Sequence, residues 1–332
     1  MLAARLNTKT RTLSLEDVPT PEPGPGQVRI KVRAAGVCLS DVHLIDGILR
    51  SRYAQQDVVT LGHEVAGTVD ALGPGVAGHP AGHRVLLQAS EERDGVVLTR
   101  GVDYDGGWAE YALATATTLV PIPDGLPFEQ AAIIPDAVST PWAAITATAQ
   151  VRPAEAVGVW GVGGLGAHAV QLLRLTGAAP IIAIDPLAAA RERALAFGAD
   201  VALDSADPEL AGTVRQQTGG HGLAAAFDFA GVPAVREQAI RCLGAAGRLV
   251  LVGLTDKPLT ITSSTFSYFG QQVRGHYGSA PQHVTELVKL TGRGRIDFAR
   301  SVSDVLPLSE APKAVERLRR KEGNPIRLVL QP

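Results

Sequence analysis

Residues 156–178, "AVGVWGVGGLGAHAVQLLRLTGA", carry the clearest structural pattern in the chain. This stretch begins as a continuous apolar run, passes through a glycine-rich turn and continues with the spacing of a helix. The same order recurs as far as "RLVLVGL" (248–254), with "PIIAIDP" (180–186) as a further strand. Continuous apolar strands that alternate with helices are typical of a parallel sheet covered on both faces. The pattern predicts a doubly wound α/β domain that binds a dinucleotide.

The segments on either side of this domain have a different character. Residues 1 to about 125 contain short alternating strands such as "VRIKVRAAGV" (28–37), broken by turns such as "PTPEPGPGQ" (19–27), which predicts a compact β-rich domain. The tail ends in a further strand that can rejoin this first domain. We therefore expect a β-rich domain from residues 1–137 together with 277–332, and a dinucleotide domain from residues 138–276, since 332 residues exceed one ordinary core.

Composition restricts the partners and the compartment. With a net charge of −2 and 19% charged residues, the chain favours neither nucleic acid nor an anionic membrane, and a small, weakly charged molecule is the expected partner. The most apolar window, residues 156–167, is too short and too rich in glycine to span a bilayer. Two cysteines cannot build a disulfide framework and the first residues lack a signal-peptide pattern, so we expect a cytoplasmic protein.

The turn "GVGGLG" (161–166) predicts the phosphate-binding site of the second domain. Gly161 permits a tight turn, Gly163 lets the backbone approach a pyrophosphate, and Gly166 lets strand and helix pack closely. Gly164 and Leu165 complete the turn, and the following helix offers free N–H groups to the phosphates. A glycine-rich turn with no ligand is the alternative interpretation.

The predicted cofactor is NAD(H). Asp185 lies nineteen residues beyond Gly166, at the end of the next strand, where a carboxylate accepts hydrogen bonds from ribose hydroxyls and repels a 2′-phosphate. Arg191, six residues further on, either lies near the adenine or serves a 2′-phosphate, so NADP(H) stays an open alternative.

Candidate metal ligands occur in the first domain. Cys38 in "GVCLSDVH" (36–43) and His63 in "GHEVAG" (62–67) are side chains that zinc prefers, and a catalytic zinc takes three protein ligands and keeps one position open. Taken alone, Cys38 is more often an inert buried thiol and His63 a satisfied half-buried histidine.

These motifs, with "GGWAEYAL" (106–113), "GVGGLG" and the order of the domains, resemble the zinc-dependent alcohol dehydrogenases of the medium-chain dehydrogenase/reductase superfamily. The resemblance covers essentially the whole chain. It implies a GroES-like catalytic domain plus a Rossmann domain, one catalytic Zn²⁺ per subunit, and NAD(H). The implied reaction is oxidation of a primary or secondary, hydrophobic alcohol, with reduction of the aldehyde or ketone in reverse.

The resemblance also implies roles for individual residues around the metal. Cys38 and His63 bind the zinc, Asp41 holds His63 in the correct tautomer, and Glu64 lies close behind the metal. Best-known members have a cysteine as third ligand, whereas the matching segment "IIPDAVSTPW" (133–142) has Asp136. A carboxylate is an ordinary zinc ligand, so Asp136 is the expected third one, and a helix N-cap is its alternative role.

Further roles follow from the same resemblance. Ser40 bonds the substrate oxygen and His43 passes the proton to solvent. Thr140 contacts the nicotinamide side and Arg327 reaches the cofactor pyrophosphate, unless Arg327 is a solvated residue at a strand end. The expected substrate pocket consists of three apolar side chains, with core packing as the alternative for the first: Trp108, Ile48 and Leu49.

One departure from the family concerns a second metal. Many members carry a four-cysteine lobe for a structural zinc, and the matching stretch, residues 86–107, contains no cysteine. We therefore expect at most one zinc per subunit. By analogy the chain forms a homodimer or a homotetramer.

Two rival functions remain open on the sequence. One is a metal-free quinone or enoyl reductase of the same superfamily, which uses NADPH; such a chain is not expected to keep Cys38, Asp41, His63 and Glu64 together. The other is a non-enzymatic dinucleotide-binding protein, against which the intact residues of the proton path argue.

Overall fold

The structure is a computed structural model that describes residues 1–54 and 56–332. Its contacts divide the chain into two compact units, residues 1–139 with 280–332 and residues 140–279. The predicted boundaries differ from these by two and three residues. Among the described residues no helix is long and apolar enough to cross a membrane.

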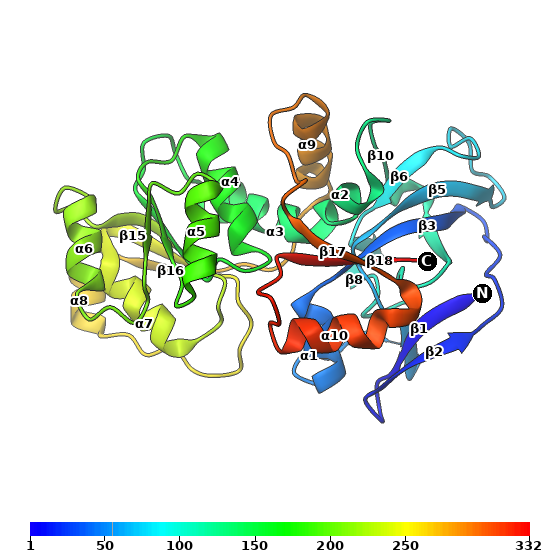
Figure 1. Cartoon of the computed structure of the whole chain (residues 1–332), viewed down its shortest axis with the longest axis horizontal. Coiled ribbons are helices and arrows are strands. Elements are labelled where there is room, and N and C mark those ends of the chain that lie inside the picture. The colour runs from blue at the N-terminus through cyan, green and yellow to red at the C-terminus, as the bar shows by residue number, and fades with distance from the viewer. Residues whose placement is uncertain (55) are drawn as a thin grey trace. The chain divides into compact units, whose positions relative to one another are not determined.

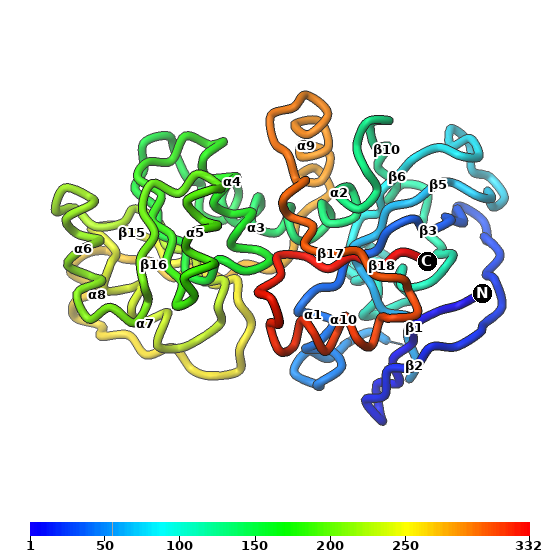
Figure 2. Tube along the Cα trace, viewed as in Figure 1, coloured from blue at the N-terminus to red at the C-terminus, as the bar shows by residue number. Residues whose placement is uncertain are grey.

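The first unit is built on a seven-stranded sheet. Its strands follow the order β10-β6-β5-β3-β18-β17, and β9 pairs with β3 beside this path. Their bounds are β3 (Gln27–Val37), β5 (Val65–Leu72), β6 (Arg84–Leu87), β9 (Tyr111–Thr115), β10 (Leu119–Pro121), β17 (Val302–Pro307) and β18 (Arg327–Gln331). The terminal strand β18 pairs antiparallel with β3, so the tail does rejoin the first domain. Figure 2 shows this end of the chain beside the early β3 segment.

Smaller elements complete the first unit. A second sheet has the order β2-β1-β4, from β1 (Leu2–Asn7), β2 (Thr12–Asp17) and β4 (Val58–Thr60). The helices are α1 (Leu39–Asp46), α2 (Phe128–Ala132), α9 (Pro281–Gly292) and α10 (Ala311–Arg319), and a π-helical turn η2 spans Ile134–Val138. Apolar residues of β1, β3, β5, β6, β18, α1 and α10 form one buried core. This core fixes the ends of the strands from which the site residues project.

The stretch that matches the four-cysteine lobe folds as a hairpin of β7 (Ser90–Arg93) and β8 (Val96–Thr99). Its turn is Asp94-Gly95, both with positive φ (51° and 77°), as a tight two-residue hairpin turn requires. Behind it, the carboxylate of Asp103 accepts a hydrogen bond from the Thr99 N–H at 2.7 Å. The guanidiniums of Arg93 and Arg100 both lie over the ring of Tyr104. Hydrogen bonds and cation–π contacts thus hold this segment.

The second unit is the doubly wound domain that the sequence predicts (Figure 1). Its six parallel strands have the order β13-β12-β11-β14-β15-β16, the order of two mononucleotide-binding halves. They are β11 (Val157–Trp160), β12 (Ile181–Ile184), β13 (Val201–Leu203), β14 (Leu223–Asp228), β15 (Leu243–Leu251) and β16 (Gln272–Gly275). The intervening helices are α4 (Gly166–Thr176), α5 (Ala188–Ala196), α6 (Leu210–Gln217) and α7 (Pro233–Cys242), with α8 (Ser263–Tyr268) before β16. In such folds ligands bind at the carboxyl ends of the strands.

Candidate functional site

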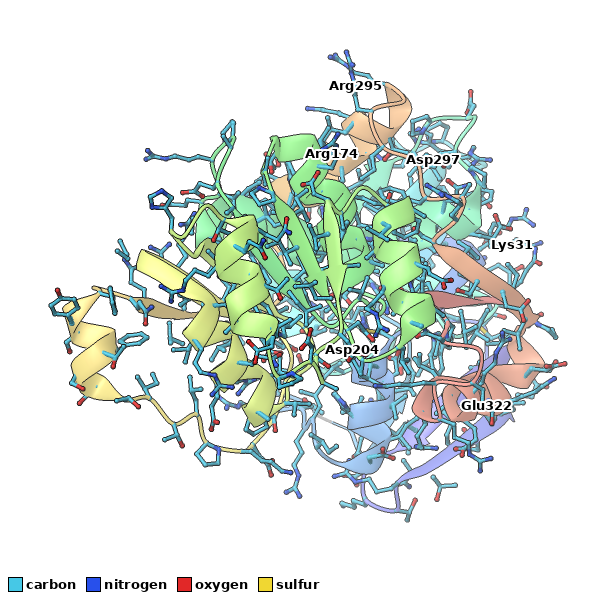
Figure 3. All side chains as sticks on the ribbon, turned by 60° about the vertical axis from the view of Figure 1, so that its left-hand side comes forward. Lys31, Arg174, Asp204, Arg295, Asp297 and Glu322 are labelled. Carbon is cyan, nitrogen blue, oxygen red and sulfur yellow. The ribbon has the colours of Figure 1, made fainter. Side chains whose placement is uncertain are left out.

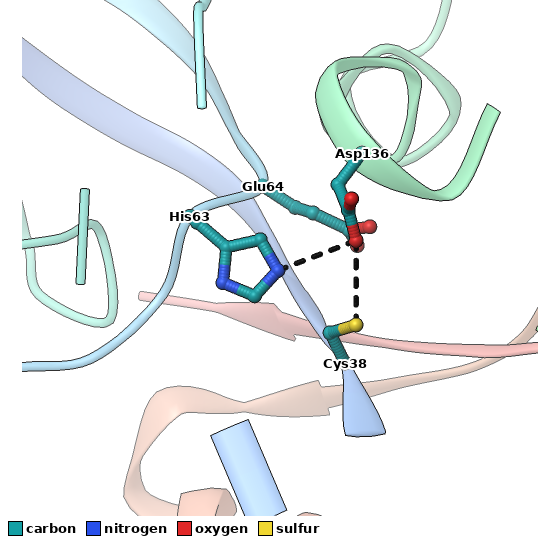
Figure 4. Close-up of side chains that lie close together, drawn as sticks. All are labelled: Cys38, His63, Glu64 and Asp136. Carbon is teal, nitrogen blue, oxygen red and sulfur yellow. Dashed lines mark hydrogen bonds and ion pairs between the residues drawn. The ribbon is translucent and has the colours of Figure 1, made fainter. Parts of the chain in front are cut away.

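Four side chains with metal-binding atoms meet inside the first unit. Cys38, His63, Glu64 and Asp136 each offer one ligand atom, and these atoms all lie within 4.8 Å of one another. Cys38 Sγ is 3.3 Å and His63 Nε2 is 3.4 Å from Asp136 Oδ2, as Figure 4 shows. Separate segments supply them: the start of α1, the loop before β5 and the turn η2. Cys38 and His63 are almost fully buried, whereas the Asp136 side chain is 18% exposed.

Asp41 orients this group through two contacts. Its Oδ2 accepts a hydrogen bond from the Cys38 N–H at 2.8 Å, which satisfies a backbone donor at the start of α1. Its Oδ1 lies 3.5 Å from His63 Nδ1. Because Nδ1 faces Asp41, Nε2 faces the sulfur and the Asp136 carboxylate. This is the orientation of a histidine that binds a metal through Nε2 and donates its other ring N–H to a carboxylate.

Glu64, one of the four residues, forms an ion pair with Arg327. Arg327 Nη2 donates to Glu64 Oε1 at 2.6 Å, and the Ala137 N–H donates to the same oxygen at 2.9 Å. Arg327 Nη2 also lies 3.5 Å from both Cys38 Sγ and Asp136 Oδ2. Gly36 leaves no room for a side chain, because a Cβ at this position would lie 1.9 Å from Glu64 Oε2. Arg327 thus contacts three members of the metal-binding group. Its expected contact with a cofactor pyrophosphate stays a prediction.

Burial and neighbouring charges shift the pKa values of two members of the group. Burial raises the pKa of Glu64 to about 7, against the lowering effect of Arg327, and Asp136 raises it further. Burial lowers the pKa of His63, but Asp41 and Asp136 outweigh burial and hold this pKa well above its ordinary value. Three carboxyl groups and a thiol therefore surround one imidazole and one guanidinium. A divalent cation bound by these side chains would favour the thiolate, the neutral imidazole and the carboxylates, which are the forms that bind metals.

The other predicted residues of the proton path lie on α1. Ser40 Oγ is 3.5 Å from Cys38 Sγ. His43, one turn further along, is half-buried, and burial lowers its pKa while Asp46 raises it. Residues three apart share one face of a helix, so Ser40 and His43 project to the same side of α1.

The predicted pocket residues have different positions in the structure. Trp108 is fully buried, its indole N–H donates to the Gly36 carbonyl at 3.0 Å, and its ring packs against Gly62, whose φ is +96°. Trp108 belongs to the core and supports the loop that carries His63, which is the alternative role that the sequence left open for it. Ile48 is 61% exposed after the end of α1, and Leu49 packs partly against the core.

In the second unit the glycine turn fits a dinucleotide. Gly161 has φ +85°, and a Cβ at Gly166 would lie 1.9 Å from the Gly161 carbonyl oxygen. A Cβ at Gly163 would meet nothing within 4 Å, so the backbone is open to an approaching phosphate. Leu165 occupies the N-cap position of α4, and the Gly164 carbonyl accepts a hydrogen bond from His168 Nδ1 at 2.7 Å. The first turn of α4 therefore begins directly at this open position.

Asp185 follows β12 and is tied to the glycine turn. Its Oδ2 accepts from the Val162 N–H at 2.8 Å and its Oδ1 from the Leu187 N–H at 2.9 Å. Arg191 Nη1 donates to the carbonyls of Asp185 and Pro186. The carboxylate and the arginine that the sequence singles out thus lie together beside the phosphate turn.

A hollow of about 460 Å³ lies at the carboxyl ends of β15 and β16. It is lined by Arg236, Leu251, Val252, Gly253, Leu254, Thr255, Gly275, His276 and Tyr277. His276 Nε2 bonds with the Thr140 carbonyl at 3.0 Å, so Thr140 lies behind a lining residue.

Arg236 lines this hollow and was not predicted from the sequence. Arg236 Nε donates to the buried Asp228 at 2.7 Å and its Nη2 to the Gly253 carbonyl at 2.7 Å. The aspartate at the end of "AAAFD" (224–228) was the available signal, because it ends a buried strand.

Comparisons with known proteins agree with this geometry. Residues 24–124 match the alcohol dehydrogenase GroES-like domain and residues 164–293 match the zinc-binding dehydrogenase domain. An NDMA-dependent alcohol dehydrogenase of Amycolatopsis methanolica is 31% identical over 90% of this chain and 89% of its own length. The alcohol dehydrogenase of the archaeon Aeropyrum pernix has a TM-score of 0.90 at 28% identity, with both chains fully covered. An NAD-dependent alcohol dehydrogenase has the same TM-score at 27% identity, also over both full chains.

The chain belongs to the zinc-dependent alcohol dehydrogenases of the medium-chain dehydrogenase/reductase superfamily. It is an oxidoreductase that transfers hydride between an alcohol and NAD, and zinc is its metal. The metal-free and the non-enzymatic alternatives are therefore set aside.

Proposed function

We propose that Cys38, His63 and Asp136 bind the catalytic Zn²⁺ and that Glu64 lies behind it. The observation that carries this proposal is the meeting of the four ligand atoms within 4.8 Å in the first unit. One thiolate, one imidazole and one carboxylate are a three-ligand set that leaves a position for substrate. The contact between Asp41 Oδ1 and His63 Nδ1 supports the role of Asp41 as the group that fixes the tautomer of His63.

When bound, the zinc supplies a Lewis acid that lowers the pKa of an alcohol hydroxyl and polarises a carbonyl in the reverse reaction. Ser40 would accept the hydroxyl proton of the substrate as it gives up its own hydroxyl proton toward His43, and His43 would deliver a proton to water. The shared face of Ser40 and His43 on α1 supports this order. The lowered pKa of His43 favours the neutral imidazole, which is the form that accepts a proton.

NAD(H) supplies the hydride acceptor. Gly161, Gly163, Gly164, Leu165 and Gly166 form the turn against which the pyrophosphate lies. Asp185 accepts hydrogen bonds from the adenosine ribose hydroxyls.

The nicotinamide half of the cofactor binds at the hollow beyond β15 and β16. Thr140 supports this end through its contact with His276. Arg327 also binds the pyrophosphate of the cofactor, in addition to its ion pair with Glu64.

The substrate is a hydrophobic primary or secondary alcohol, or the matching aldehyde or ketone. The exposed side chain of Ile48 and the half-buried side chain of Leu49, which follow the helix that carries Ser40 and His43, support an apolar wall at this place. Each added methylene of a substrate that contacts such a wall adds up to about 0.8 kcal/mol of binding free energy.

The assembly is a homodimer or a homotetramer, and the compartment is the cytoplasm. β16 is an edge strand of the second unit's sheet, and the adjoining Tyr268 and Phe269 are 84% and 43% exposed. An unpaired parallel edge beside exposed aromatic rings favours pairing with a second copy. Sedimentation analysis tests this: Tyr268→Ser with Phe269→Ser is expected to yield monomers, and an unchanged sedimentation coefficient contradicts the proposed interface.

The function is tested by metal analysis together with substrate profiling. Protein purified without added metal is expected to contain one zinc per subunit and to oxidise aliphatic or aromatic alcohols with NAD. Absence of zinc combined with NADPH-dependent reduction of enones contradicts the zinc site. NADH binding without turnover of any alcohol or carbonyl contradicts the proton path through Ser40 and His43.

A further inference from the structure

Arg191 is held by a third residue that the glycine motif does not include. Arg191 Nη1 lies 3.1 Å from Asp204 Oδ2, in addition to its bonds with the carbonyls of Asp185 and Pro186 at 2.9 and 2.8 Å. The side chains of Arg191 and Asp204 are 23% and 40% exposed, so the pair lies at the rim of the second unit.

Register explains why Asp204 lies there. β12 and β13 are parallel with Ile184 opposite Leu203, and the Asp185 N–H donates to the Leu203 carbonyl at 3.2 Å. Asp185 and Asp204 are therefore the first residues beyond two adjacent strand ends. Figure 3 marks Asp204 at this end of the sheet. Its Oδ1 also accepts from the Ala206 N–H at 2.8 Å, which holds the side chain in place.

An arginine in this neighbourhood is the group that accommodates the 2′-phosphate of NADP in dinucleotide-binding domains. Arg191 is therefore a latent phosphate-binding residue directly beside Asp185. With Asp204 in contact, the guanidinium is already paired, and a second carboxylate near the ribose edge adds repulsion toward a phosphate.

We propose that Asp204 is a specificity-determining residue that disfavours NADP(H) by pairing with Arg191. The proposal goes beyond the role of Asp185 and rests on the proposed cofactor site. Asp185 contacts the ribose directly, whereas Asp204 acts on the residue that would otherwise take the 2′-phosphate.

The test is equilibrium binding of NADH and NADPH to the zinc-loaded protein, followed by the fluorescence of the reduced nicotinamide. Asp204→Asn keeps an oxygen for the Ala206 N–H and removes the charge. The Kd for NADPH is expected to fall by about three- to tenfold at low salt, and the Kd for NADH by less than about twofold. Added salt is expected to reduce the difference, because the pair is partly exposed.

A matched control is Asp207→Asn. Asp207 lies three residues further along the same loop, and its Oδ1 likewise accepts a backbone hydrogen bond, from the Glu209 N–H at 2.8 Å. Asp207→Asn removes the same charge without touching Arg191 and is expected to leave the ratio of the two Kd values unchanged. Arg191→Gln is expected to abolish the gain in NADPH affinity when it is combined with Asp204→Asn.

Three results overturn the proposal. An unchanged ratio in Asp204→Asn that still binds NADH removes the role of Asp204 and leaves the cofactor site intact. An equal gain in NADPH affinity in Asp207→Asn shows that removing any nearby negative charge has this effect, and that the pair with Arg191 is not its cause. Wild-type protein that binds neither cofactor overturns the cofactor site itself. Should Asp204→Asn be poorly folded by circular dichroism, Asp204→Ser, whose hydroxyl oxygen can accept from the Ala206 N–H, decides between these outcomes.

Discussion

Arg327 and Glu64 lie 263 positions apart in the sequence and form a two-point ion pair inside the first unit, from Nη2 to Oε1 at 2.6 Å and from Nε to Oε2 at 3.1 Å. Glu64 is fully buried and Arg327 is 3% exposed. A buried charge that loses its partner is costly.

Arg327→Met is expected to destabilise the protein by about 3–5 kcal/mol, because it leaves the Glu64 carboxylate buried and unpaired. Urea unfolding measures this. Glu64→Gln with Arg327→Met is expected to be less destabilised than the sum of the single variants. The control is Arg317→Met, whose pair with Asp304 is exposed and contributes about 0–1 kcal/mol. Equal losses in Arg327→Met and Arg317→Met contradict the importance of burial for this pair.

Cys38→Ala is expected to lose zinc and turnover while it still binds NADH, because the sulfur is one of three proposed ligands. Elemental analysis and NADH fluorescence measure the two properties separately. Cys242→Ala is the matched control: Cys242 is the other buried free cysteine and lies in the core of the second unit. Full zinc content in Cys38→Ala refutes the ligand assignment.

Asp41→Asn is expected to weaken zinc binding about 10- to 100-fold, because His63 Nδ1 loses its carboxylate partner. The amide oxygen can still accept the Cys38 N–H, so α1 keeps its first turn. Asp41→Ala loses this hydrogen bond as well and is expected to cost a further ~1 kcal/mol of stability. Competition with a chromophoric chelator measures the affinity, and identical zinc affinity in wild type and Asp41→Asn refutes the orienting role.

Two glycine variants separate packing from cofactor contact. Gly166→Ala places a Cβ 1.9 Å from the Gly161 carbonyl oxygen and is expected to lower the melting temperature and abolish NADH binding. Gly163→Ala meets no neighbour and is expected to keep the melting temperature while it weakens NADH binding. Calorimetry and NADH titration distinguish the two. Unchanged NADH affinity in Gly163→Ala argues against phosphate approach at this position.

The stability of the protein is expected to depend on pH through His43. Burial disfavours its charged form and lowers its pKa below the ordinary value of 6.5 in the folded state, with a smaller opposite effect of Asp46. Below that value the unfolded chain binds more protons than the folded one. The stability contributed by neutral His43 is therefore complete above pH 6.5 and is lost as pH falls toward the lower folded pKa.

His43→Gln removes this dependence. As the pH falls, the free energy of unfolding of the wild type is therefore expected to decrease more than that of His43→Gln. Urea unfolding between about pH 5 and pH 8 measures the difference. A difference that is constant over this range shows that His43 has the same pKa in both states.

Local patterns predicted the elements of the second unit because each strand is a continuous apolar run and each helix has its own period. The parallel sheet of the second unit and the return of β18 to the sheet of the first unit agree with these expectations. The sequence left two roles open for Trp108, and in the structure its side chain is part of the core. Whether an aromatic ring lines a channel or fills a core depends on the Gly62 and Gly36 segments that pack around it, and the ring's own neighbours in sequence do not reveal this.

Residue type, spacing and context predicted the glycine turn, whereas Cys38, His63 and Asp41 were selected only once their motifs were compared with a known family. Pairing between distant segments was decided only by the tertiary structure. Arg327 meets Glu64 because β18 is added to the sheet beside β3, and Asp204 meets Arg191 because two parallel strands end side by side. Such contacts depend on strand order and register, which a linear pattern of residues does not specify.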